Sequence, residues 1–262
     1  MIDLKGKVAI VTGSATGVGA ATAIMLAKEG CNVVINYSKS SAEAEETAAA
    51  CRAEGVEAIL VQANVAEDAD CRKLVDAAIA KWGRLDHVVN NAGTTKFAGH
   101  GDLSALSADD FHWIYGVNVI GPYQMAKWAE PHLRKAGKAS ITNVSSIAGV
   151  TGVGSCVAYA ASKGALNTMT LSLARVLGPE IRVNAICPGM IQSRWLQNGM
   201  GADQYEKTLA AQQKGLPLRR VSTPEDNAEV ILWLIKGSEL VTGETIMIDG
   251  GMHLGFAPLM AR

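Results

Sequence analysis

The feature that most constrains the fold of this chain is a regular alternation between short apolar runs and longer segments that end at a glycine. The runs are rich in β-branched residues, which is typical of strands buried on both faces of a parallel sheet. Three of the longer segments end next to Gly30, Gly55 and Gly83, where glycine can adopt the left-handed conformation that closes a helix. Because strand and helix alternate, we expect right-handed βαβ crossovers and a doubly wound parallel sheet.

We therefore predict a single Rossmann-type domain over residues 1–262, with the three layers of an α/β/α sandwich. No low-complexity linker or run of charge divides the chain. The expected strands are 7–12, 32–36, 58–62, 86–90, 139–144, 182–186 and 245–248. One expected helix ends at Gly30, others cover 41–54, 67–82, 107–134 and 156–177, and a further one starts at Thr223-Pro224. The helix over 107–134 can kink at Gly121-Pro122. Residues 190–217, a long and weakly periodic stretch after a strand, are expected to form a substrate-binding segment.

Composition argues against several classes of function. The formal net charge is −1, which gives no electrostatic reason to expect nucleic acid or an anionic membrane as a partner. No apolar run approaches the roughly 18 residues of a membrane span, and the N-terminus lacks a basic and apolar signal segment, so we expect a cytoplasmic protein. The five cysteines include no Cys-x-x-Cys pair and the five histidines are scattered, so neither a disulfide frame nor a metal site is predicted.

A glycine-rich loop directly follows the first predicted strand. It reads Gly13-Ser14-Ala15-Thr16-Gly17-Val18-Gly19. Backbone N–H groups of such a loop, at the start of a helix, can bind a phosphate. The spacing differs from the Gly-x-Gly-x-x-Gly of dinucleotide-binding folds, and the alternative is a tight turn without a ligand. Its place at the first strand–helix junction favours a nucleotide site, formed by Gly13, Ser14, Thr16, Gly17, Val18 and Gly19.

The residues after the second strand bear on the choice between NAD and NADP. In dinucleotide folds an acidic residue about twenty positions past the glycine loop binds the adenosine ribose of NAD. Here the sequence is Tyr37-Ser38-Lys39, without a carboxylate. Ser38 and Lys39 can bind a 2′-phosphate, so we favour NADP(H) over NAD(H). The alternative is that Lys39 is an ordinary solvated lysine.

A hydroxyl, a phenol and an ammonium are expected to meet after the fifth strand. Ser146 follows that strand, and Tyr159 and Lys163 lie four residues apart on the next helix, so both project from one face. Tyr123 and Lys127 repeat this spacing in the preceding helix, where a packed or subunit surface is the simpler interpretation. We expect Lys163 to lower the pKa of Tyr159 from about 10 towards 7, which makes the phenol a useful general acid or base.

A serine hydrolase is the competing interpretation of Ser145-Ser146. It requires a Gly-x-Ser-x-Gly elbow, which neither serine has. His253 is the one histidine late enough in the chain to serve as its base, and nothing in the sequence places it nearby. The hydrolase is therefore disfavoured.

Taken together, these residues resemble the short-chain dehydrogenase/reductase family over essentially the whole chain. The matching motifs are Thr12-Gly13-x-x-x-Gly17-x-Gly19, Asn90-Asn91-Ala92-Gly93, Asn118, Ser146, Tyr159-x-x-x-Lys163, Pro188-Gly189, Thr242-Gly243 and Asp249-Gly250-Gly251. The resemblance implies a seven-stranded parallel sheet, hydride transfer between a nicotinamide cofactor and a carbonyl or secondary alcohol, and a homotetramer. Within the family the chain looks most like 3-oxoacyl-carrier-protein reductases and glucose dehydrogenases.

The resemblance also implies roles for individual residues. Tyr159 would donate or accept the proton, and Lys163 would bind the nicotinamide ribose. Ser146 would hold the substrate, and Asn118 would complete a proton relay. The further cofactor contacts that it implies are Asn64, Val65, Asn91, Ala92, Gly93, Pro188, Gly189, Ile191 and Ser193. Asn64 stands where the family usually has an aspartate, and Ser193 where it usually has a threonine.

The resemblance leaves the substrate open. The pocket is expected to lie between residues 94–101, 147–155 and 190–217. Phe97, Trp195 and Met200 would make it partly apolar, although each fits core or lid packing equally well. The apolar residues of 256–262 are expected to reach a neighbouring subunit's pocket. A 3-oxoacyl-carrier-protein substrate is the alternative to a small carbonyl compound, and a nucleotide-binding regulator is disfavoured because all four catalytic positions are filled.

Overall fold

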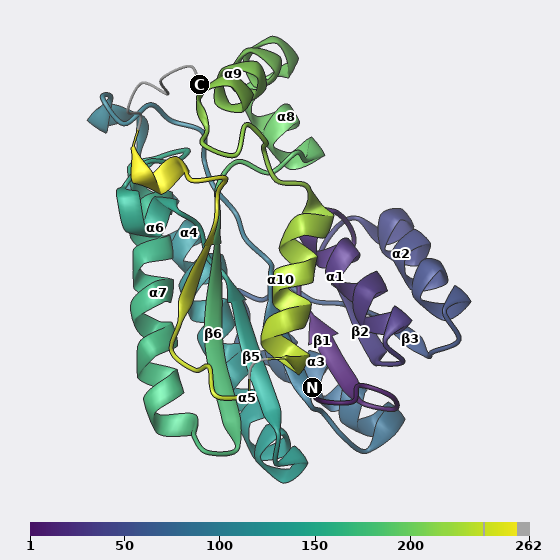
Figure 1. The fold of residues 1–262 in the computed structure, drawn as a ribbon. Helices are drawn as coiled ribbons and strands as arrows, with labels where there is room; N and C mark the ends of the chain where they lie inside the picture. Colours follow the sequence, from purple (N-terminus) through teal and green to yellow (C-terminus); the bar gives the residue numbers. More distant parts are fainter. Residues whose placement is uncertain (238, 256–262) are drawn as a thin grey trace.

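The computed structural model describes residues 1–237 and 239–255, which form one parallel sheet between two layers of helices (Figure 1). The strands are β1 (Val8–Val11), β2 (Asn32–Tyr37), β3 (Ala58–Gln62), β4 (His87–Asn90), β5 (Ala139–Val144), β6 (Ile181–Pro188) and β7 (Thr245–Ile248). They pair in the order β3-β2-β1-β4-β5-β6-β7, and every pair is parallel. From β1 to β3 the strands are added towards one edge of the sheet, and from β4 to β7 they are added towards the other. This switch between β1 and β4 opens a crevice at the carboxyl ends of the strands. The predicted fold class and the seven-stranded sheet are confirmed.

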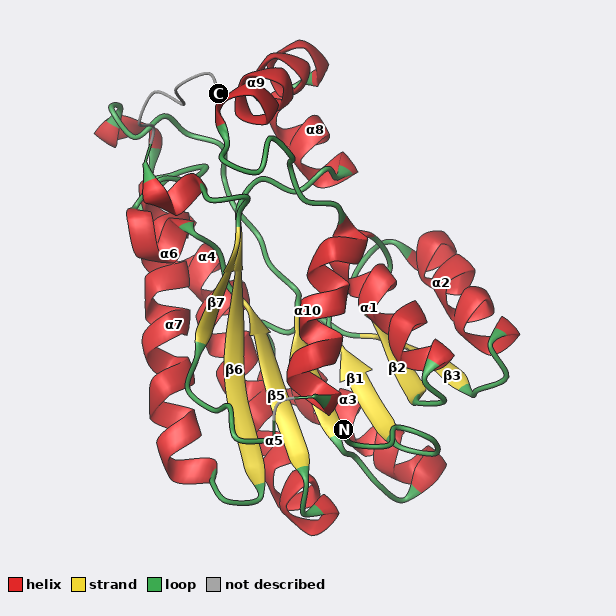
Figure 2. Ribbon diagram, in the orientation of Figure 1, coloured by secondary structure: helices red, strands yellow, loops and turns green. Residues whose placement is uncertain are grey.

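Helices cover both faces of the sheet (Figure 2). They are α1 (Gly17–Lys28), α2 (Ser41–Ala53), α3 (Asp68–Trp82), α4 (Ala108–Tyr115), α5 (Gly121–Ala136), α6 (Ala148–Thr151), α7 (Val157–Leu177), α8 (Arg194–Met200), α9 (Ala202–Gly215) and α10 (Pro224–Lys236). One apolar cluster packs α1, α2 and α10 on one face, and a second packs α3, α5 and α7 on the other. Among the described helices, none combines the length and apolar character that crossing a membrane requires.

The central strands are buried from end to end, as their apolar composition predicts. Ile10 on β1 and Ile141 on β5 are fully buried. Burying a side chain of this size stabilises the fold by about 2 kcal/mol relative to leaving it exposed. This rigid centre fixes the carboxyl ends of β1, β4 and β5, from which the loops of the crevice start.

The helix predicted over residues 107–134 is present in three pieces. After α4 the chain makes a π-helical turn, η2 (Gly116–Ile120), before α5 begins. A Cβ added at Gly121 would lie 2.9 Å from the Val65 carbonyl oxygen, so this glycine lets α5 pack directly against the backbone that precedes α3. The π-helical turn also places Asn118 in the interior, where it is fully buried. The irregularity expected near Gly121 is therefore a change of helix type and not a proline kink.

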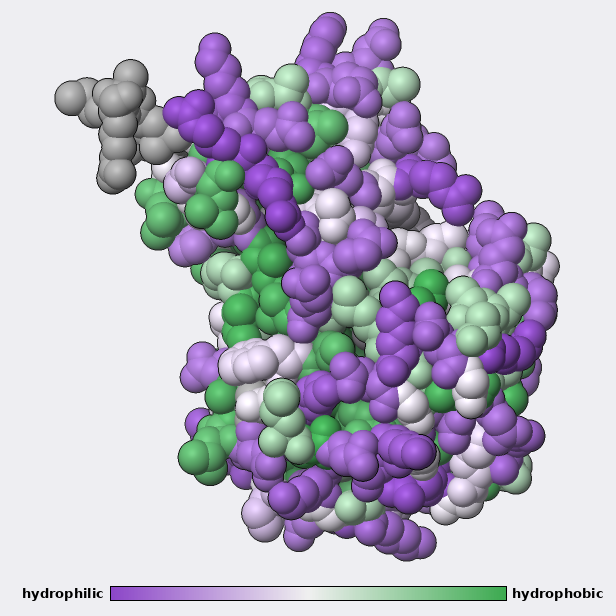
Figure 3. Space-filling view, turned by 45° about the vertical axis from the view of Figure 1, so that its right-hand side comes forward, coloured by the Kyte–Doolittle hydropathy of each residue, from purple (hydrophilic) through white to green (hydrophobic). Residues whose placement is uncertain are grey.

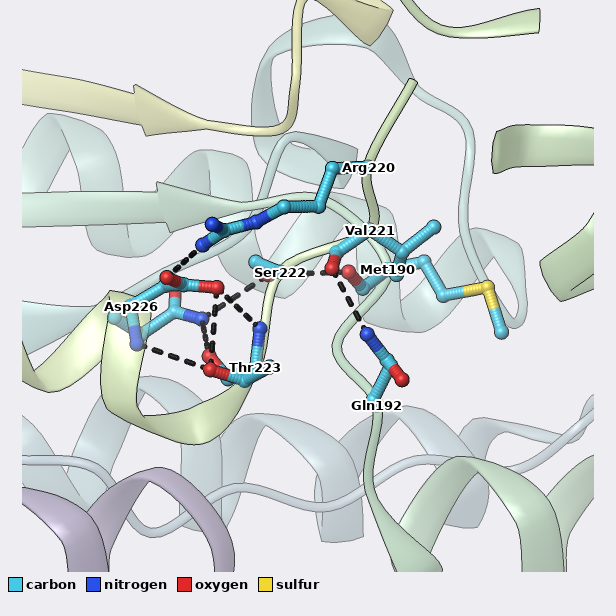
Figure 4. A network of polar contacts seen from close by, with 8 residues as sticks. Met190, Gln192, Arg220, Val221, Ser222, Thr223 and Asp226 are labelled. Carbon is cyan, nitrogen blue, oxygen red and sulfur yellow. Dashed lines mark hydrogen bonds and ion pairs between the residues drawn. The ribbon is translucent and has the colours of Figure 1, made fainter. Parts of the chain in front are cut away.

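The segment 190–217 forms α8 and α9 beyond the carboxyl ends of the strands (Figure 1). Its two ends are held side by side, because Ile191 makes a parallel bridge with Ser222. The backbone N–H of Gln192 donates to the Ser222 carbonyl at 2.9 Å. The Gln192 side-chain amide donates to the Val221 carbonyl at 3.0 Å, and the Ser222 hydroxyl donates to the Met190 carbonyl at 3.2 Å (Figure 4). Residues 190–192 and 222 thus form a hydrogen-bonded base from which the α8–α9 segment projects.

α10 begins directly after this base, where Thr223 and Asp226 form a capping box (Figure 4). Asp226 also pairs with Arg220, which precedes the junction. The predicted start of this helix, with Thr223 as its N-cap and Pro224 in its first turn, is confirmed. Residues 256–262, for which a contact with a neighbouring subunit was predicted, lie outside the described residues.

Candidate active site

Side chains from the two neighbouring strands hold the glycine loop after β1. Asn36, on β2, accepts a hydrogen bond from the Gly13 N–H at 2.9 Å and donates to the Ala63 carbonyl at 3.0 Å. Asn91, just after β4, donates to the carbonyls of Thr12 and Gly13, both at 2.9 Å. These bonds satisfy buried backbone groups and fix the shape of the loop from within the protein.

Ser14 and Thr12 also hold this loop. Ser14 was predicted to contact the cofactor, but it is fully buried. Its hydroxyl donates to a β1 carbonyl at 2.7 Å and accepts from the Asn36 N–H at 2.9 Å. The Thr12 hydroxyl accepts from the N–H groups of Asn91 and Ala92, each at 3.0 Å. The side chain of Ser14 therefore positions the loop and does not face the crevice.

The first turn of α1 offers its N–H groups to the crevice. Within the described residues, no side chain caps this helix at Thr16. Gly17 has a φ of +60°, and a Cβ there would meet nothing within 4 Å. At Gly19, by contrast, a Cβ would lie 2.5 Å from the Gly13 carbonyl oxygen, so this glycine allows the helix to pack against the loop. Val18 is buried beneath the turn. The arrangement is that of an anion-binding helix terminus.

The residues predicted for the adenosine end lie at the carboxyl ends of β2 and β3. Ser38 and Lys39 are exposed, and Tyr37 is partly buried against the apolar cluster that includes β2. Asn64 is exposed, and its side-chain oxygen accepts a backbone N–H at 3.2 Å. Val65 is buried. The charged group of Lys39 is thus free to meet a ligand at this edge of the sheet.

Ser146, Tyr159 and Lys163 converge beyond the carboxyl end of β5. The Ser146 hydroxyl lies close enough to the Tyr159 phenol to lower its pKa. The ammonium of Lys163 lies 5.6 Å from the centre of the Tyr159 ring and donates to the Val144 carbonyl at 2.8 Å. Ser145 is buried, and its hydroxyl donates to the Lys163 carbonyl at 3.2 Å. Ser146, and not Ser145, therefore faces the phenol.

Burial dominates the protonation of this pair. Burial raises the pKa of Tyr159 to about 12, although the Ser146 hydroxyl lowers it in part. Burial lowers the pKa of Lys163 to about 8. The predicted lowering of the Tyr159 pKa towards 7 is therefore wrong, because burial disfavours the charged form of each group more than any attraction between them favours it. At neutral pH the phenol is protonated and the ammonium is charged.

Asn118 links the loop after β4 to α7. Its Oδ1 accepts from the Thr94 N–H at 2.8 Å, and its Nδ2 donates to the Thr94 carbonyl and to the Ser162 hydroxyl, both at 3.0 Å. A Cβ added at Gly93 would lie 3.6 Å from Asn118 Oδ1 and 3.7 Å from Lys163 Nζ. The Gly93 backbone therefore passes directly over the ammonium, and the Asn118 side chain holds it there.

The opposite wall of the crevice follows β6. Pro188 ends that strand, and a Cβ added at Gly189 would lie 2.9 Å from Asp249 Cβ, so the glycine allows close packing beside β7. Ile191 lies in the bonded base of the α8–α9 segment, and Ser193 is the N-cap residue of α8. The four residues predicted on this side thus lead from the sheet into α8.

Two aromatic side chains from the predicted substrate pocket lie near the phenol. The ring centres of Trp195 and Tyr159 are 6.5 Å apart, and those of Trp195 and Phe97 are 5.9 Å apart. Met200 ends α8 and is partly exposed. Phe97 and Trp195 are therefore brought together at the reacting end of the crevice.

Comparison with known proteins supports one family. The family model described as Enoyl-(Acyl carrier protein) reductase matches residues 13–253. The granaticin polyketide synthase putative ketoacyl reductase 2 of Streptomyces violaceoruber is 44% identical over 250 residues, which are 95% of this chain and 97% of that protein. Glucose 1-dehydrogenase 2 of Bacillus subtilis is 36% identical over 256 residues, 96% of each chain. The crystal structure of a putative short-chain dehydrogenase/reductase from Burkholderia xenovorans matches with a TM-score of 0.89 and 41% identity, over 95% of this chain and 98% of that one. The chain belongs to the short-chain dehydrogenase/reductase family.

As a short-chain dehydrogenase/reductase, the protein is an oxidoreductase that acts on carbonyl or alcohol groups with a nicotinamide cofactor. The residues of this structure fit such a cofactor. The open surface at Gly17 and the uncapped first turn of α1 suit a pyrophosphate, and the close passage of Gly93 over Lys163 leaves a backbone without a side chain beside the ammonium. The resemblance read from the sequence motifs is confirmed.

Two residues that shape the site of this dehydrogenase/reductase were not predicted. Asn36 fastens the glycine loop, and Ser162 accepts the hydrogen bond of Asn118 at a position between Tyr159 and Lys163 on α7. Asn36 carried a signal, because it is a polar residue at the end of an otherwise apolar strand. Ser162 carried none, since a serine within a helix is common and its partner lies 44 residues away.

Proposed function

We propose that Tyr159 is the general acid and base of this oxidoreductase and that Ser146, Lys163 and Asn118 support it. The observation that carries the proposal is the convergence of the Ser146 hydroxyl and the Tyr159 phenol beside the buried ammonium of Lys163. The nicotinamide, when bound, supplies or takes up the hydride. In carbonyl reduction the Tyr159 hydroxyl gives its proton to the substrate oxygen, and in alcohol oxidation it takes that proton back.

The supporting residues have distinct tasks. The Ser146 hydroxyl hydrogen-bonds the substrate oxygen and stabilises the charge that develops on it. The ammonium of Lys163 is positive at neutral pH and lies beside the phenol, so it favours the tyrosinate left after proton transfer. Asn118 bonds the loop after β4 to α7 and so fixes the width of the crevice at this point.

NADP(H) is the cofactor that the described residues favour. The end of β2 presents the exposed Lys39 and Ser38 where an NAD-binding enzyme presents a carboxylate. A 2′-phosphate bound there gains a charge-assisted hydrogen bond. The proposed cofactor contacts are Gly13, Thr16, Gly17, Val18, Gly19, Tyr37, Ser38, Lys39, Asn64, Val65, Asn91, Ala92, Gly93, Tyr159, Lys163, Pro188, Gly189, Ile191 and Ser193, with Ser14 as a residue that positions the loop.

A homotetramer in the cytoplasm completes the proposal. Trp113, Ile120 and Tyr123 are each about half exposed along α4, η2 and α5, an apolar surface suited to a second copy of the chain. Figure 3 shows further apolar surface towards its left-hand side, the side on which the edge strand β7 lies in Figure 2. The five cysteines are unpaired and buried, which suits a reducing compartment.

A 3-oxoacyl thioester on an acyl carrier protein is the alternative substrate. The family model, which is named after an acyl carrier protein, favours the carrier, and the name of the ketoacyl reductase relative favours the 3-oxoacyl group. Acetoacetyl-CoA, a simple 3-oxoacyl thioester, is therefore included beside small ketones and alcohols when activity is measured with NADPH, NADH and their oxidised forms.

Replacing Tyr159 by phenylalanine tests the proposal. Because the variant keeps the ring but loses the proton that the reaction needs, we expect Tyr159→Phe to lower kcat by about 10²- to 10⁴-fold while the Kd of NADPH, measured by fluorescence titration, changes by less than about twofold. Tyr123→Phe, at the repeated spacing on α5, is the matched control and is expected to keep full activity. The opposite pattern, with Tyr123 essential and Tyr159 dispensable, would show that the wrong tyrosine has been chosen, and a protein that binds NADPH but turns over no carbonyl or alcohol would be a nucleotide-binding regulator.

A further inference from the structure

The reacting end of the crevice concentrates a residue type that the chain otherwise uses sparingly. Aromatic residues make up 5% of the sequence. Three of them, from three separate parts of the chain, meet here, since Phe97 follows β4, Trp195 lies on α8 and Tyr159 lies on α7. The proton transfer proposed above requires only the tyrosine. Phe97 and Trp195 take no part in that transfer, so a different role must account for their position.

The α8 helix builds this arrangement from two positions on one face. Trp195 and Gly199 are four residues apart, so they lie above one another along the helix. Phe97 packs against that face, because a Cβ added at Gly199 would lie 1.9 Å from its Cε2 and 2.2 Å from its Cζ. The missing side chain at Gly199 is what allows the Phe97 ring to lie beside Trp195. We call Phe97, Trp195 and Gly199 the aromatic wall.

The rings of the aromatic wall pack against each other but remain partly exposed to solvent. Phe97 is 38% exposed and Trp195 is 46% exposed, although the two rings also contact each other. The planes of Trp195 and Tyr159 are inclined by 44°, and those of Trp195 and Phe97 by 57°. Lys96, next to Phe97, is held by Asp110 at 2.9 Å, so its charge is already paired. The exposed area beside the phenol is therefore ring surface with little competing charge.

This surface matches a ligand that carries a ring. Aromatic rings prefer offset or edge-to-face contacts with centres about 4.5 to 7 Å apart, and the 6.5 Å between Trp195 and Tyr159 already lies in that range. A substrate whose carbonyl oxygen is bonded to Tyr159 places the group attached to that carbonyl within reach of Trp195. A flat ring directly attached to the carbonyl can pack against the indole without leaving the hydrogen bond.

We propose that the substrate is a ketone, or the corresponding alcohol, whose carbonyl carries a planar aromatic ring, and that Trp195 and the Phe97–Gly199 contact select for that ring. This inference rests on the proposed function and specifies its substrate class. It assigns Trp195 to direct contact with the substrate ring. Gly199 acts through Phe97, as a positioning residue.

The test compares two methyl ketones of nearly equal size, acetophenone with its flat ring and cyclohexyl methyl ketone with its puckered one. Specificity is the ratio of their kcat/KM values, and each variant is compared with the wild type so that the intrinsic reactivities of the ketones cancel. Removing the indole should lower this ratio about tenfold in Trp195→Ala. Trp195→Phe, which restores a ring, should keep the ratio within about threefold of the wild type.

Trp233→Ala is the matched control, because Trp233 is also 46% exposed but lies on α10. It should leave the ratio unchanged. A fall of less than about threefold in Trp195→Ala, with NADPH still bound, overturns the proposal. A wild-type enzyme that reduces acetoacetyl-CoA but neither ketone overturns it as well and leaves the proposed function standing. An enzyme that turns over none of the three counts against both.

Gly199→Ala provides a second, independent variant. The added methyl group meets only the far end of the Phe97 side chain, so the ring must swing away while the fold is kept. We expect the ratio for the aromatic ketone to fall by about fivefold. It should stay low in the double variant Gly199→Ala with Phe97→Leu, because the shorter side chain removes the clash but leaves no ring at position 97. Gly178→Ala, at the C-terminal end of α7, is the control, because an added Cβ there meets nothing closer than 3.7 Å. An unchanged ratio in Gly199→Ala would remove the positioning role.

Discussion

The ammonium of Lys163 is almost completely buried, at 3% exposure, and donates to the Val144 carbonyl. Water can no longer stabilise its charge, so its pKa is lowered to about 8. The same burial keeps the Tyr159 phenol protonated, with a pKa of about 12. Lys163 therefore titrates near pH 8 while Tyr159 stays protonated, and the pH dependence of kcat/KM can detect this difference.

Carbonyl reduction should therefore lose efficiency above about pH 8. Below the Lys163 pKa the ammonium is charged and favours the tyrosinate that forms, and above it the charged fraction falls about tenfold per pH unit. We expect kcat/KM for reduction to be level at pH 7 and to decline with that slope towards pH 10. A profile that stays level up to pH 10 would contradict this role, and the free energy of unfolding measured over the same range controls for loss of the fold.

Lys39 is the residue that we propose to set the cofactor preference, and it too can be tested by a single substitution. Lys39→Ala should raise the Kd of NADPH by about 10- to 100-fold, the effect of one hydrogen bond to a charged group, while the Kd of NADH changes by less than about twofold. Lys135→Ala, at an exposed lysine near the end of α5, is the control for a general loss of charge. Equal effects of Lys39→Ala on both cofactors would place the 2′-phosphate elsewhere.

At the residue scale, the sequence predicted correctly those positions that spacing along the chain determines. The four-residue step from Tyr159 to Lys163 had to place both on one face of α7, and their convergence with Ser146 follows from where β5 ends. The error concerned the Tyr159 pKa, because burial depends on everything packed around the phenol and not on the distance to one lysine. The catalytic roles themselves stay predictions until the variants are measured.

At the scale of elements, strands were predicted more accurately than the connections between them. The bounds of β3, β5 and β7 coincide with the predicted ranges, because short β-branched runs between polar residues leave little freedom. The helix over 107–134 was predicted with a proline kink at Gly121-Pro122 as its only irregularity, since its pattern carries no sign of the π-helical turn that packing near Val65 imposes. The loop 147–155 was likewise predicted without α6, a helix of a single turn.

Asp86 fastens the amino-terminal ends of several strands. Its carboxylate accepts from Arg84 Nη2 at 2.7 Å and from the Val8 N–H at 3.0 Å, and its side chain is 1% exposed. Burial alone would raise the pKa of Asp86, but the hydrogen bonds from Arg84 and Val8 outweigh it and hold the pKa below its usual value. The carboxylate therefore stabilises the fold at every pH above its unfolded pKa of about 4, and this contribution is lost as the pH falls through the lower folded value.

Asp86→Asn should lower the free energy of unfolding by about 2 kcal/mol at pH 7, because it leaves Arg84 without its charged partner. Urea denaturation measures this difference, which should shrink as the pH is lowered towards about 3. Asp76→Asn removes an ion pair whose carboxylate is 63% exposed, and it should change stability by less than about 0.5 kcal/mol. Equal effects of the two substitutions would show that the buried carboxylate is not a structural anchor.

At the scale of the whole molecule, the alternation of strand and helix was enough to predict the layered architecture. The order of the strands across the sheet was not predicted, because alternation and right-handed crossovers are compatible with more than one order, and the structure supplies it. The assembly could not be read in the same way. Whether a half-exposed apolar side chain belongs to an interface depends on a second surface that the sequence of one chain does not display.

The apolar surface along α4, η2 and α5 makes the assembly testable. We expect light scattering to give about four times the 27.4 kDa of one chain. Ile120→Glu, which would bury a charge at the contact, should shift the protein to smaller species. Leu240→Glu introduces the same charge at a fully exposed loop position and should leave the mass unchanged. A wild type that is monomeric at micromolar concentration would contradict the tetramer.

The bridge between Ile191 and Ser222 has a consequence for how such proteins diversify. Because the chain leaves the scaffold and rejoins it at one place, the portion between can be lengthened, shortened or exchanged without altering where it starts and finishes. Where this portion binds the substrate, as we propose, such an exchange alters what the enzyme accepts and leaves the glycine loop, Tyr159 and Lys163 in place. A graft of this portion from a relative is the corresponding experiment.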